Sequence, residues 1–100
     1  MQDVVILDGT RTAIGTYGGA LSGIAPTALA AAVSEEAMAR SGVDPAQIGT
    51  SVFGHVINTE PRDMYMGRVA AVDAGVPDEA TGLTVNRLCG SGAQAIVTAA

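Results

Sequence analysis

Short apolar runs alternate along this chain with longer stretches in which apolar positions recur at helical spacing. Continuous runs rich in β-branched side chains predict strands, and they occupy residues 4–7, 51–57 and 83–88. Apolar side chains three and four positions apart predict helices, and they occupy residues 26–41, 64–74 and 92–100. This alternation of strand and helix predicts an α/β fold with a parallel sheet.

Proline and glycine mark the ends of the predicted helices. Pro26 suits the first turn of a helix, and Gly42 and Gly75 supply left-handed stops. Asp44 begins a one-turn capping sequence, and Gly54 in the second strand admits the close approach of another backbone. The last helix has no stop signal, and three strands leave two sheet edges uncovered. We therefore expect an incomplete domain.

The composition is that of a globular chain with an acidic balance. Of 100 residues, 48% are apolar, and ten acids against five scattered arginines leave a net charge of −5. Such a chain repels a phosphate backbone, which excludes nucleic acid as a partner. No apolar stretch approaches the ~20 residues of a bilayer-spanning helix, and the acidic start does not match a signal peptide. We expect no contact with a membrane.

The use of cysteine, histidine and glycine excludes several kinds of site. One cysteine and one histidine cannot build a closed zinc site, so we expect no metal. A single cysteine cannot form an internal disulfide, which favours a reducing cytoplasm. The glycine-rich loop at residues 11–19 lacks the G-x-G-x-x-G spacing of a dinucleotide site. We expect no permanently bound cofactor.

Cys89 stands between the third predicted strand and the third predicted helix. Ligands of open parallel sheets bind at the carboxyl ends of the strands, and a helix N-terminus stabilises a thiolate or an oxyanion. Gly90 and Gly92 permit a sharp turn and leave room for an acyl group beside the sulfur. Cys89 is thus a candidate nucleophile, and the alternative is a buried cysteine that packs as a small apolar side chain.

A helix end alone does not activate a thiol. Lowering a thiol pKa by two units takes about 2.7 kcal/mol, whereas a helix end supplies at most about 2 kcal/mol. A base or a cation must supply the remainder. His55 is the only histidine, but a lone histidine in a strand is more often a packing or hydrogen-bonding residue, so it is a weak candidate for this base.

Three segments resemble the thiolase family. The run Asn-Arg-Leu-Cys-Gly-Ser-Gly-Ala-Gln-Ala at residues 86–95 resembles the family's active-cysteine segment, and residues 8–19 resemble its opening segment. Residues 53–68 are similar to the β-ketothiolase branch, which accepts chains longer than acetyl. The resemblance covers all 100 residues.

This resemblance implies a fold and an activity. Thiolases are dimers or tetramers whose subunits have two similar halves in layers of helix, sheet, helix, sheet and helix. Residues 1–100 match the start of the N-terminal half. The family's cysteine is acylated by an acyl-CoA, and the acyl group passes to the enolate of acetyl-CoA or, in thiolysis, to free CoA. The implied substrates are CoA thioesters, in fatty acid metabolism or polyhydroxyalkanoate synthesis.

The resemblance also implies roles for individual residues. Cys89 matches the nucleophile, and its backbone N–H matches one oxyanion donor. Flexible or aromatic side chains that follow the second strand are candidates for the acyl pocket, although methionines at a helix start are more often core residues: Met64, Tyr65 and Met66. Residues of the third strand and the cysteine turn are candidates for the dimer contact: Thr84, Asn86 and Arg87. The family's activating histidine and second cysteine lie outside these residues, so we expect residues 1–100 alone to be inactive.

Three other interpretations stay open. A ketoacyl-synthase condensing enzyme also acylates a cysteine but decarboxylates a malonyl donor, and the Arg11-Thr-Ala-Ile-Gly opening weighs against it. A thiolase-like lipid-binding or interaction protein without turnover is the second. A redox-sensor thiol is the third and is disfavoured, because no resolving cysteine stands nearby.

Overall fold

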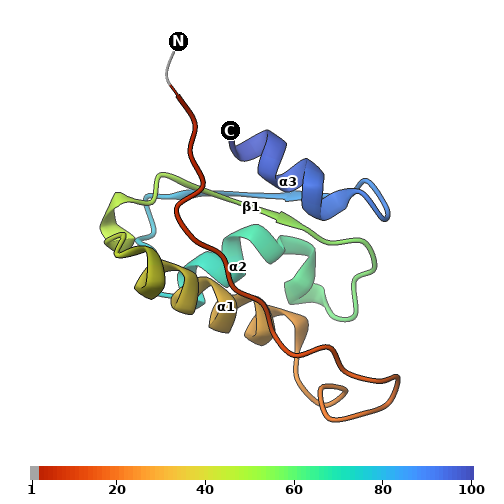
Figure 1. The fold of residues 1–100 in the computed structure, drawn as a ribbon. Helices are drawn as coiled ribbons and strands as arrows, with labels where there is room; N and C mark the ends of the chain where they lie inside the picture. Colours follow the sequence, from red (N-terminus) through yellow and green to blue (C-terminus); the bar gives the residue numbers. More distant parts are fainter. Residues whose placement is uncertain (1–2) are drawn as a thin grey trace.

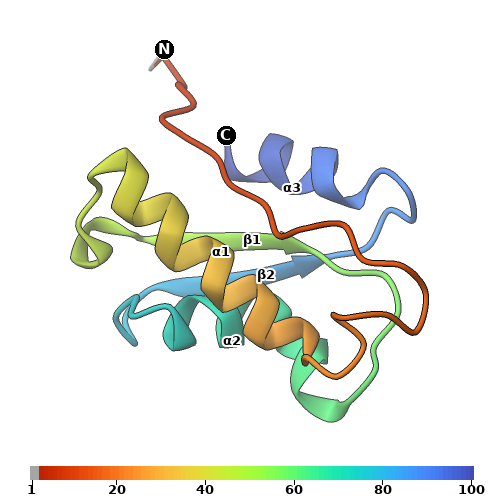
Figure 2. The same cartoon turned by 60° about the horizontal axis from the view of Figure 1, so that its bottom comes forward.

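Two parallel strands lie between helices in the computed structural model, which describes residues 3–100 (Figure 1). Strands β1 (Thr50–Gly54) and β2 (Thr81–Val85) pair in parallel. Helices α1 (Pro26–Ser41) and α2 (Met66–Asp73) lie on one side of this sheet, and α3 (Ser91–Ala99) lies on the other (Figure 2). The α/β class with parallel strands, expected from the apolar pattern, is confirmed.

Two short 3-10 turns begin at prolines, η1 (Pro45–Gln47) and η2 (Pro61–Tyr65). Proline suits such a start because its fixed φ and missing N–H cost nothing there. The side chain of Asp44 accepts a hydrogen bond from Ala46 N at 2.9 Å, which confirms the predicted cap before β1. Because η2 takes up residues 61–65, the second α-helix begins at Met66, later than predicted.

Residues 4–7, predicted as the first strand, form no strand, so that prediction is wrong. Within residues 3–100, β1 and β2 pair only with each other, which leaves this segment without a ladder partner. It passes the C-terminal end of α3 (Figure 1). Val4 and Ile6 border a hollow there together with Ile96. Its four side chains are between 63% and 81% exposed. An apolar, β-branched run indicates an extended backbone. It does not indicate whether a neighbouring strand offers free N–H and C=O groups to pair with.

The core lies where α1 and α2 pack on the sheet. One cluster joins Ala30, Met66 and Ala70 to Phe53 of β1. A second cluster lies at the other end of α2, and its buried members are Ala71, Val76 and Ala80. Alanines make up most of this core, so the helices approach the sheet closely, while Ile96 and Val97 on α3 remain exposed.

Two glycines act as the sequence predicts. Gly42 ends α1 with φ 70°, in the left-handed region that only glycine enters freely. Gly54 ends β1 where α3 begins, and a Cβ there would lie 2.6 Å from the carbonyl carbon of Ser91. The missing side chain therefore allows the start of α3 to pack directly on the end of β1.

Candidate functional site

The carboxyl ends of β1 and β2 meet at one edge of the sheet. His55 N donates to Val85 O at 3.0 Å, and Asn86 Nδ2 donates to Val56 O at 3.3 Å. These two bonds continue the pairing beyond the strands. They join the segment after β1 to the turn, residues 86–90, that leads from β2 into α3.

Ser91 closes this turn from the first residue of α3. Its hydroxyl accepts from Arg87 N at 2.8 Å and donates to Leu88 O at 2.7 Å, and its side chain is buried. Asn86 Oδ1 accepts from Leu88 N at 3.0 Å. The side chains of Asn86 and Ser91 thus bind the backbone of the turn. The strand predicted at residues 83–88 ends at Val85, and the residues after it belong to this turn.

The left-handed residue of the turn is Leu88, with φ 47°. A non-glycine residue in this region is strained by of order 1–3 kcal/mol, and it persists only where its surroundings hold it. Gly90 has φ −91° and caps α3, and a Cβ on Gly92 would meet nothing within 4 Å. The left-handed residue that makes the turn sharp is therefore Leu88 and not a glycine. Room for an acyl group beside the sulfur stays a prediction for Gly90 and Gly92.

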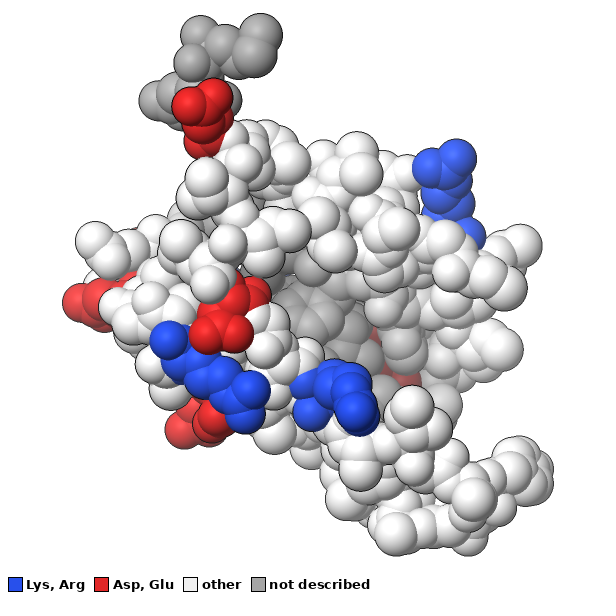
Figure 3. Space-filling view, viewed as in Figure 1, with Lys and Arg blue, Asp and Glu red and all other residues white. Residues whose placement is uncertain are grey.

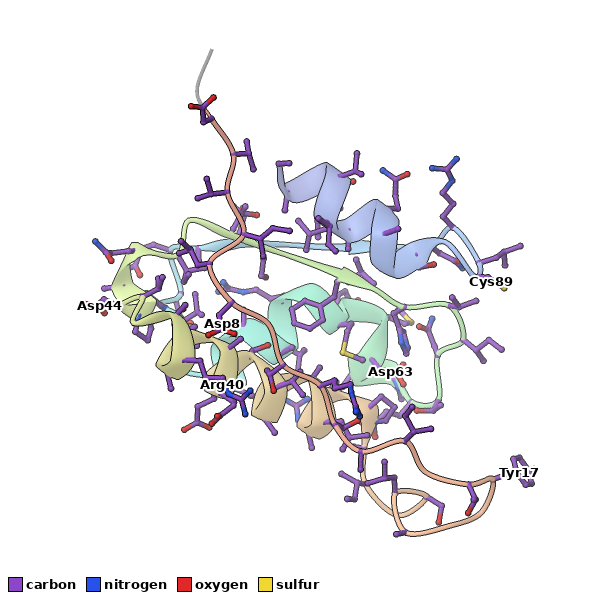
Figure 4. All side chains as sticks on the ribbon, in the orientation of Figure 1. Asp8, Tyr17, Arg40, Asp44, Asp63 and Cys89 are labelled. Carbon is purple, nitrogen blue, oxygen red and sulfur yellow. The ribbon has the colours of Figure 1, made fainter. Side chains whose placement is uncertain are left out.

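Cys89 lies at the tip of the turn as a free, exposed thiol (Figure 4). Gly90, the next residue, is the N-cap of α3, and no side chain caps the helix. The N–H groups of Gly90 and Ser91, the two residues after Cys89, donate to Arg87 O and Leu88 O within the turn. The free donors that a helix start ordinarily offers therefore begin one residue further on, at Gly92. The alternative of a cysteine buried as an apolar residue does not hold among residues 3–100.

His55 faces Asp63 and takes no part in the turn that carries Cys89. Its Nε2 lies 3.6 Å from Asp63 Oδ1, with 14% of the His55 side chain and none of the Asp63 side chain exposed. Both of these facing atoms are buried, and neither has a hydrogen-bond partner. No sequence motif singles out Asp63, although a proline two residues before an acid is a common start of a helical turn.

Asp63 also holds the segment in front of it. Its Oδ2 accepts from Thr59 N at 2.7 Å, from the Thr59 hydroxyl and from Glu60 N. Burial raises the pKa of Asp63, but the hydrogen bonds from Thr59 and Glu60 and the neighbouring His55 outweigh that effect. The pKa of Asp63 therefore lies below its ordinary value, and the side chain is a carboxylate at neutral pH.

The three candidates for the acyl pocket do not share one environment. Met66 is 3% exposed and belongs to the core cluster with Ala30 and Ala70. Met64 and Tyr65 are 51% and 59% exposed on η2. Only Met64 and Tyr65 are placed so that a ligand can reach them.

The three candidates for the dimer contact lie along β2 and its turn. The Thr84 hydroxyl accepts from Gly67 N at 3.0 Å and so binds α2 to β2 within this chain. Asn86 and Arg87 are exposed, and Arg87 Nη1 donates to Gln94 at 2.7 Å. Asn86 and Arg87 therefore present surface at the same edge as Cys89.

Charged side chains do not gather near this edge. On the face shown in Figure 3, most charged side chains lie at the lower left, where arginines stand beside acids. Three arginines pair with acids: Arg40 with Glu36, Arg62 with Asp73 and Arg68 with Asp78. In the described part of the chain no group of three potential metal ligands comes together. Across residues 3–100, no helix has the length and apolar character needed to cross a bilayer.

A family model described as "Thiolase, N-terminal domain" matches residues 4–100. The beta-ketothiolase BktB of Cupriavidus necator is 61% identical over 99 residues, which are 99% of this chain and 25% of that protein. An acetyl-CoA acetyltransferase of the same organism is 40% identical over 100 residues, again 25% of the relative.

Solved structures show the same likeness. Human mitochondrial 3-ketoacyl-CoA thiolase in complex with CoA superposes with a TM-score of 0.90 at 33% identity, over 93% of this chain and 24% of that one. The acetyl-CoA acetyltransferase of Bacillus anthracis gives a TM-score of 0.89 at 43% identity, over 95% of this chain and 24% of that one. The chain therefore spans about a quarter of the length of the relatives it matches.

Proposed function

Because the chain belongs to the thiolase family, we propose that the whole protein transfers acyl groups between CoA thioesters through an acyl-enzyme on Cys89. Two observations support this proposal. The relatives named above are a beta-ketothiolase, acetyltransferases and a thiolase solved with CoA. The observation that carries the residue assignment is the exposed thiol of Cys89 at the uncapped start of α3.

The first step is the attack of Cys89 Sγ on the thioester carbonyl of an acyl-CoA. A C–S bond forms to the enzyme, the carbonyl oxygen becomes an oxyanion, and CoA leaves as its thiolate when the original C–S bond breaks. Backbone N–H groups aimed at such an oxyanion are worth several kcal/mol in the transition state. We assign that role to the N–H of Cys89, with Gly90 and Gly92 leaving space for the acyl group.

The second step returns the acyl group to an acceptor. Attack by the enolate of acetyl-CoA forms a C–C bond and gives a 3-ketoacyl-CoA, and attack by free CoA gives a new acyl-CoA. Either attack releases the Cys89 thiolate. The enzyme keeps no cofactor, because CoA enters and leaves as part of the substrates.

The base that activates Cys89 lies outside residues 1–100 in this proposal. The end of α3 supplies at most about 2 kcal/mol toward a thiolate, and His55 is turned to Asp63. Residues 1–100 then supply the nucleophile and part of the oxyanion hole, and the rest of the protein supplies the base.

We also propose which residues contact the acyl chain and which contact a second subunit. Met64 and Tyr65 are exposed on η2, and we place them beside the acyl chain, where a flexible thioether adapts to chains of different length. We place Asn86 and Arg87, with the less accessible Thr84, at the contact between subunits of a homodimer or homotetramer.

Replacement of Cys89 tests the assignment. In the whole protein, Cys89→Ser and Cys89→Ala should each lower kcat for thiolysis of acetoacetyl-CoA by about 10⁴-fold or more, as the loss of a nucleophile does in other acyl-transfer enzymes. Ser41→Ala, at the end of α1 and away from the turn, is the control and should keep the wild-type rate. Wild-type turnover by Cys89→Ala would rule out the acyl-enzyme.

A further inference from the structure

His55 and Asp63 each have a buried polar atom without a hydrogen-bond partner, and these two atoms face each other. Nε2 of His55 and Oδ1 of Asp63 lie 3.6 Å apart, and neither makes a hydrogen bond to any other group. A gap of this size is too small for a bridging water but slightly too long for a direct bond. Buried polar groups left unpaired are costly, and a small movement of the two atoms toward each other would satisfy both.

The pair connects the end of β1 to η2, a turn that also packs against α1, α2 and β2. His55 follows β1 directly and is bonded through its backbone to Val85 of β2. Asp63 lies in η2, near the start of α2 (Figure 4), and its second oxygen binds Thr59 and Glu60. Residues 59–65 are therefore organised around Asp63, and Asp63 faces β1 through His55.

Most other charged groups on the neighbouring elements are engaged elsewhere, and the carboxylate of Glu60, the N-cap of η2, accepts a hydrogen bond from the backbone of Asp63 in a capping box. Arg62 of η2 pairs with Asp73 of α2, Arg68 of α2 pairs with Asp78, and Arg87 of the turn binds Gln94. Helix α3 carries no charged side chain, and on α1 Arg40 pairs with Glu36, which leaves Glu35. Among these groups, Asp63 is the one that faces the His55 ring.

We propose that protonated His55 and the Asp63 carboxylate form a positioning pair that fastens residues 59–65 to the carboxyl end of β1, and that the fastening weakens when His55 loses its charge. The His55 side chain is 14% exposed, although the nitrogen that faces Asp63 is buried. Histidine changes charge between about pH 5 and 8, and a charge-assisted hydrogen bond is roughly twice as strong as a neutral one. The segment that bears Met64 and Tyr65 is then held more firmly at the acidic end of this range.

Asp63 keeps its charge throughout that range. Its lowered pKa means that its contribution to stability is present above the pKa of an unfolded aspartate and is lost only as pH falls through the lower, folded value. This inference does not depend on the proposed acyl transfer, because it concerns how a segment is held and not what the site does.

Hydrogen exchange followed by mass spectrometry on the whole protein tests the inference. The peptide containing residues 59–65 is measured at about pH 5.5 and about pH 8.5, and each rate is divided by the intrinsic rate at that pH. In the wild type, protection should be about 5-fold greater at the lower pH. His55→Gln keeps a donor but not the charge, so its protection should be the same at both values.

Arg62→Gln is the matched control. It removes a charge pair from the same segment but leaves His55 and Asp63 intact, so it should keep the wild-type pH dependence. His55→Asn, which also lacks the charge, serves as the second variant if His55→Gln does not fold. Equal wild-type protection at the two pH values, or an unchanged pH dependence in the amide variants, would overturn the proposal.

Discussion

Ser91 holds the turn that carries Cys89. Its hydroxyl binds the backbone on both sides of the left-handed Leu88, accepting from Arg87 N and donating to Leu88 O. The left-handed conformation costs a residue with a Cβ about 1–3 kcal/mol, and these two bonds offset that strain. The position of Cys89 relative to α3 therefore depends on the side chain two residues after it.

Replacing Ser91 by alanine should loosen this turn. Arg87 N loses its acceptor, and leaving a donor of this kind unpaired costs about 1–3 kcal/mol. Denaturant unfolding of the whole protein should show a loss of stability in this range, and the rate of Cys89 acylation by acetyl-CoA should fall with it. Ser41→Ala, whose hydroxyl bonds only within the last turn of α1, should stay near the wild type. Wild-type stability and acylation rate in Ser91→Ala would contradict this role.

Met64 and Met66 form a matched pair, because the same substitution at two neighbouring positions should act on different properties. Met66→Ala removes a buried core side chain and should lower the free energy of unfolding by about 2–5 kcal/mol. Met64→Ala, at an exposed position, should leave stability nearly unchanged and alter the ratio of kcat/KM between short and longer 3-ketoacyl-CoA substrates. An unaltered ratio in Met64→Ala would remove this residue from the acyl pocket.

At the scale of elements, the close contact between α3 and β1 sets where the cysteine turn lies. Gly54 leaves no side chain between the end of β1 and the backbone of Ser91. The bonds from His55 N to Val85 and from Asn86 to Val56 continue the strand pairing up to the turn. The turn is thus built against both strand ends.

Adding a methyl group at Gly54 should push these elements apart. The new Cβ would lie 2.6 Å from the Ser91 carbonyl carbon, and a backbone cannot yield as a flexible side chain does. Gly54→Ala should cost about 1–3 kcal/mol of stability and reduce acylation of Cys89. Gly49→Ala is the control, because a Cβ there would meet nothing within 4 Å. Equal stability and acylation in the two variants would show that α3 does not depend on this contact.

Features that depend on a few neighbouring residues, such as helix ends, could be predicted from the sequence. Features that depend on residues distant in the sequence, such as strand pairing, could not. Gly42 and Gly75 were read correctly as left-handed stops, because a helix end depends on its own few residues. Residues 4–7 were read as a strand, because their pattern does not reveal whether a neighbour has free backbone groups. Asp63 was missed, since its importance comes from facing His55 across the fold.

At the scale of the whole molecule, this chain leaves large apolar side chains uncovered. Ile96 and Val97 of α3 are 61% and 70% exposed, and residues 4–7 are exposed beside them. The relatives are about four times as long, since 99% of this chain matches 25% of BktB. In the proposed function these apolar faces are covered, and the base is supplied, by parts of the protein outside residues 1–100.

Residues 1–100 produced alone should not turn over acetoacetyl-CoA. They carry the proposed nucleophile but not the proposed base. The helix end alone does not supply enough free energy to form the Cys89 thiolate. A spectrophotometric assay of thiolysis should show no rate above the uncatalysed reaction, under conditions in which the whole protein is active. Turnover by the truncated chain would place the base among these residues and reopen the role of His55.

The most direct test of the proposed function is to trap the acyl-enzyme. The whole protein is incubated with acetyl-CoA, quenched in acid, digested and measured by mass spectrometry. The peptide that contains Cys89 should gain the mass of one acetyl group and lose it when free CoA is added before the quench, and the same peptide of Cys89→Ala should not change. An unmodified Cys89 in an active protein, or an acetyl group on a different residue, would contradict the assignment.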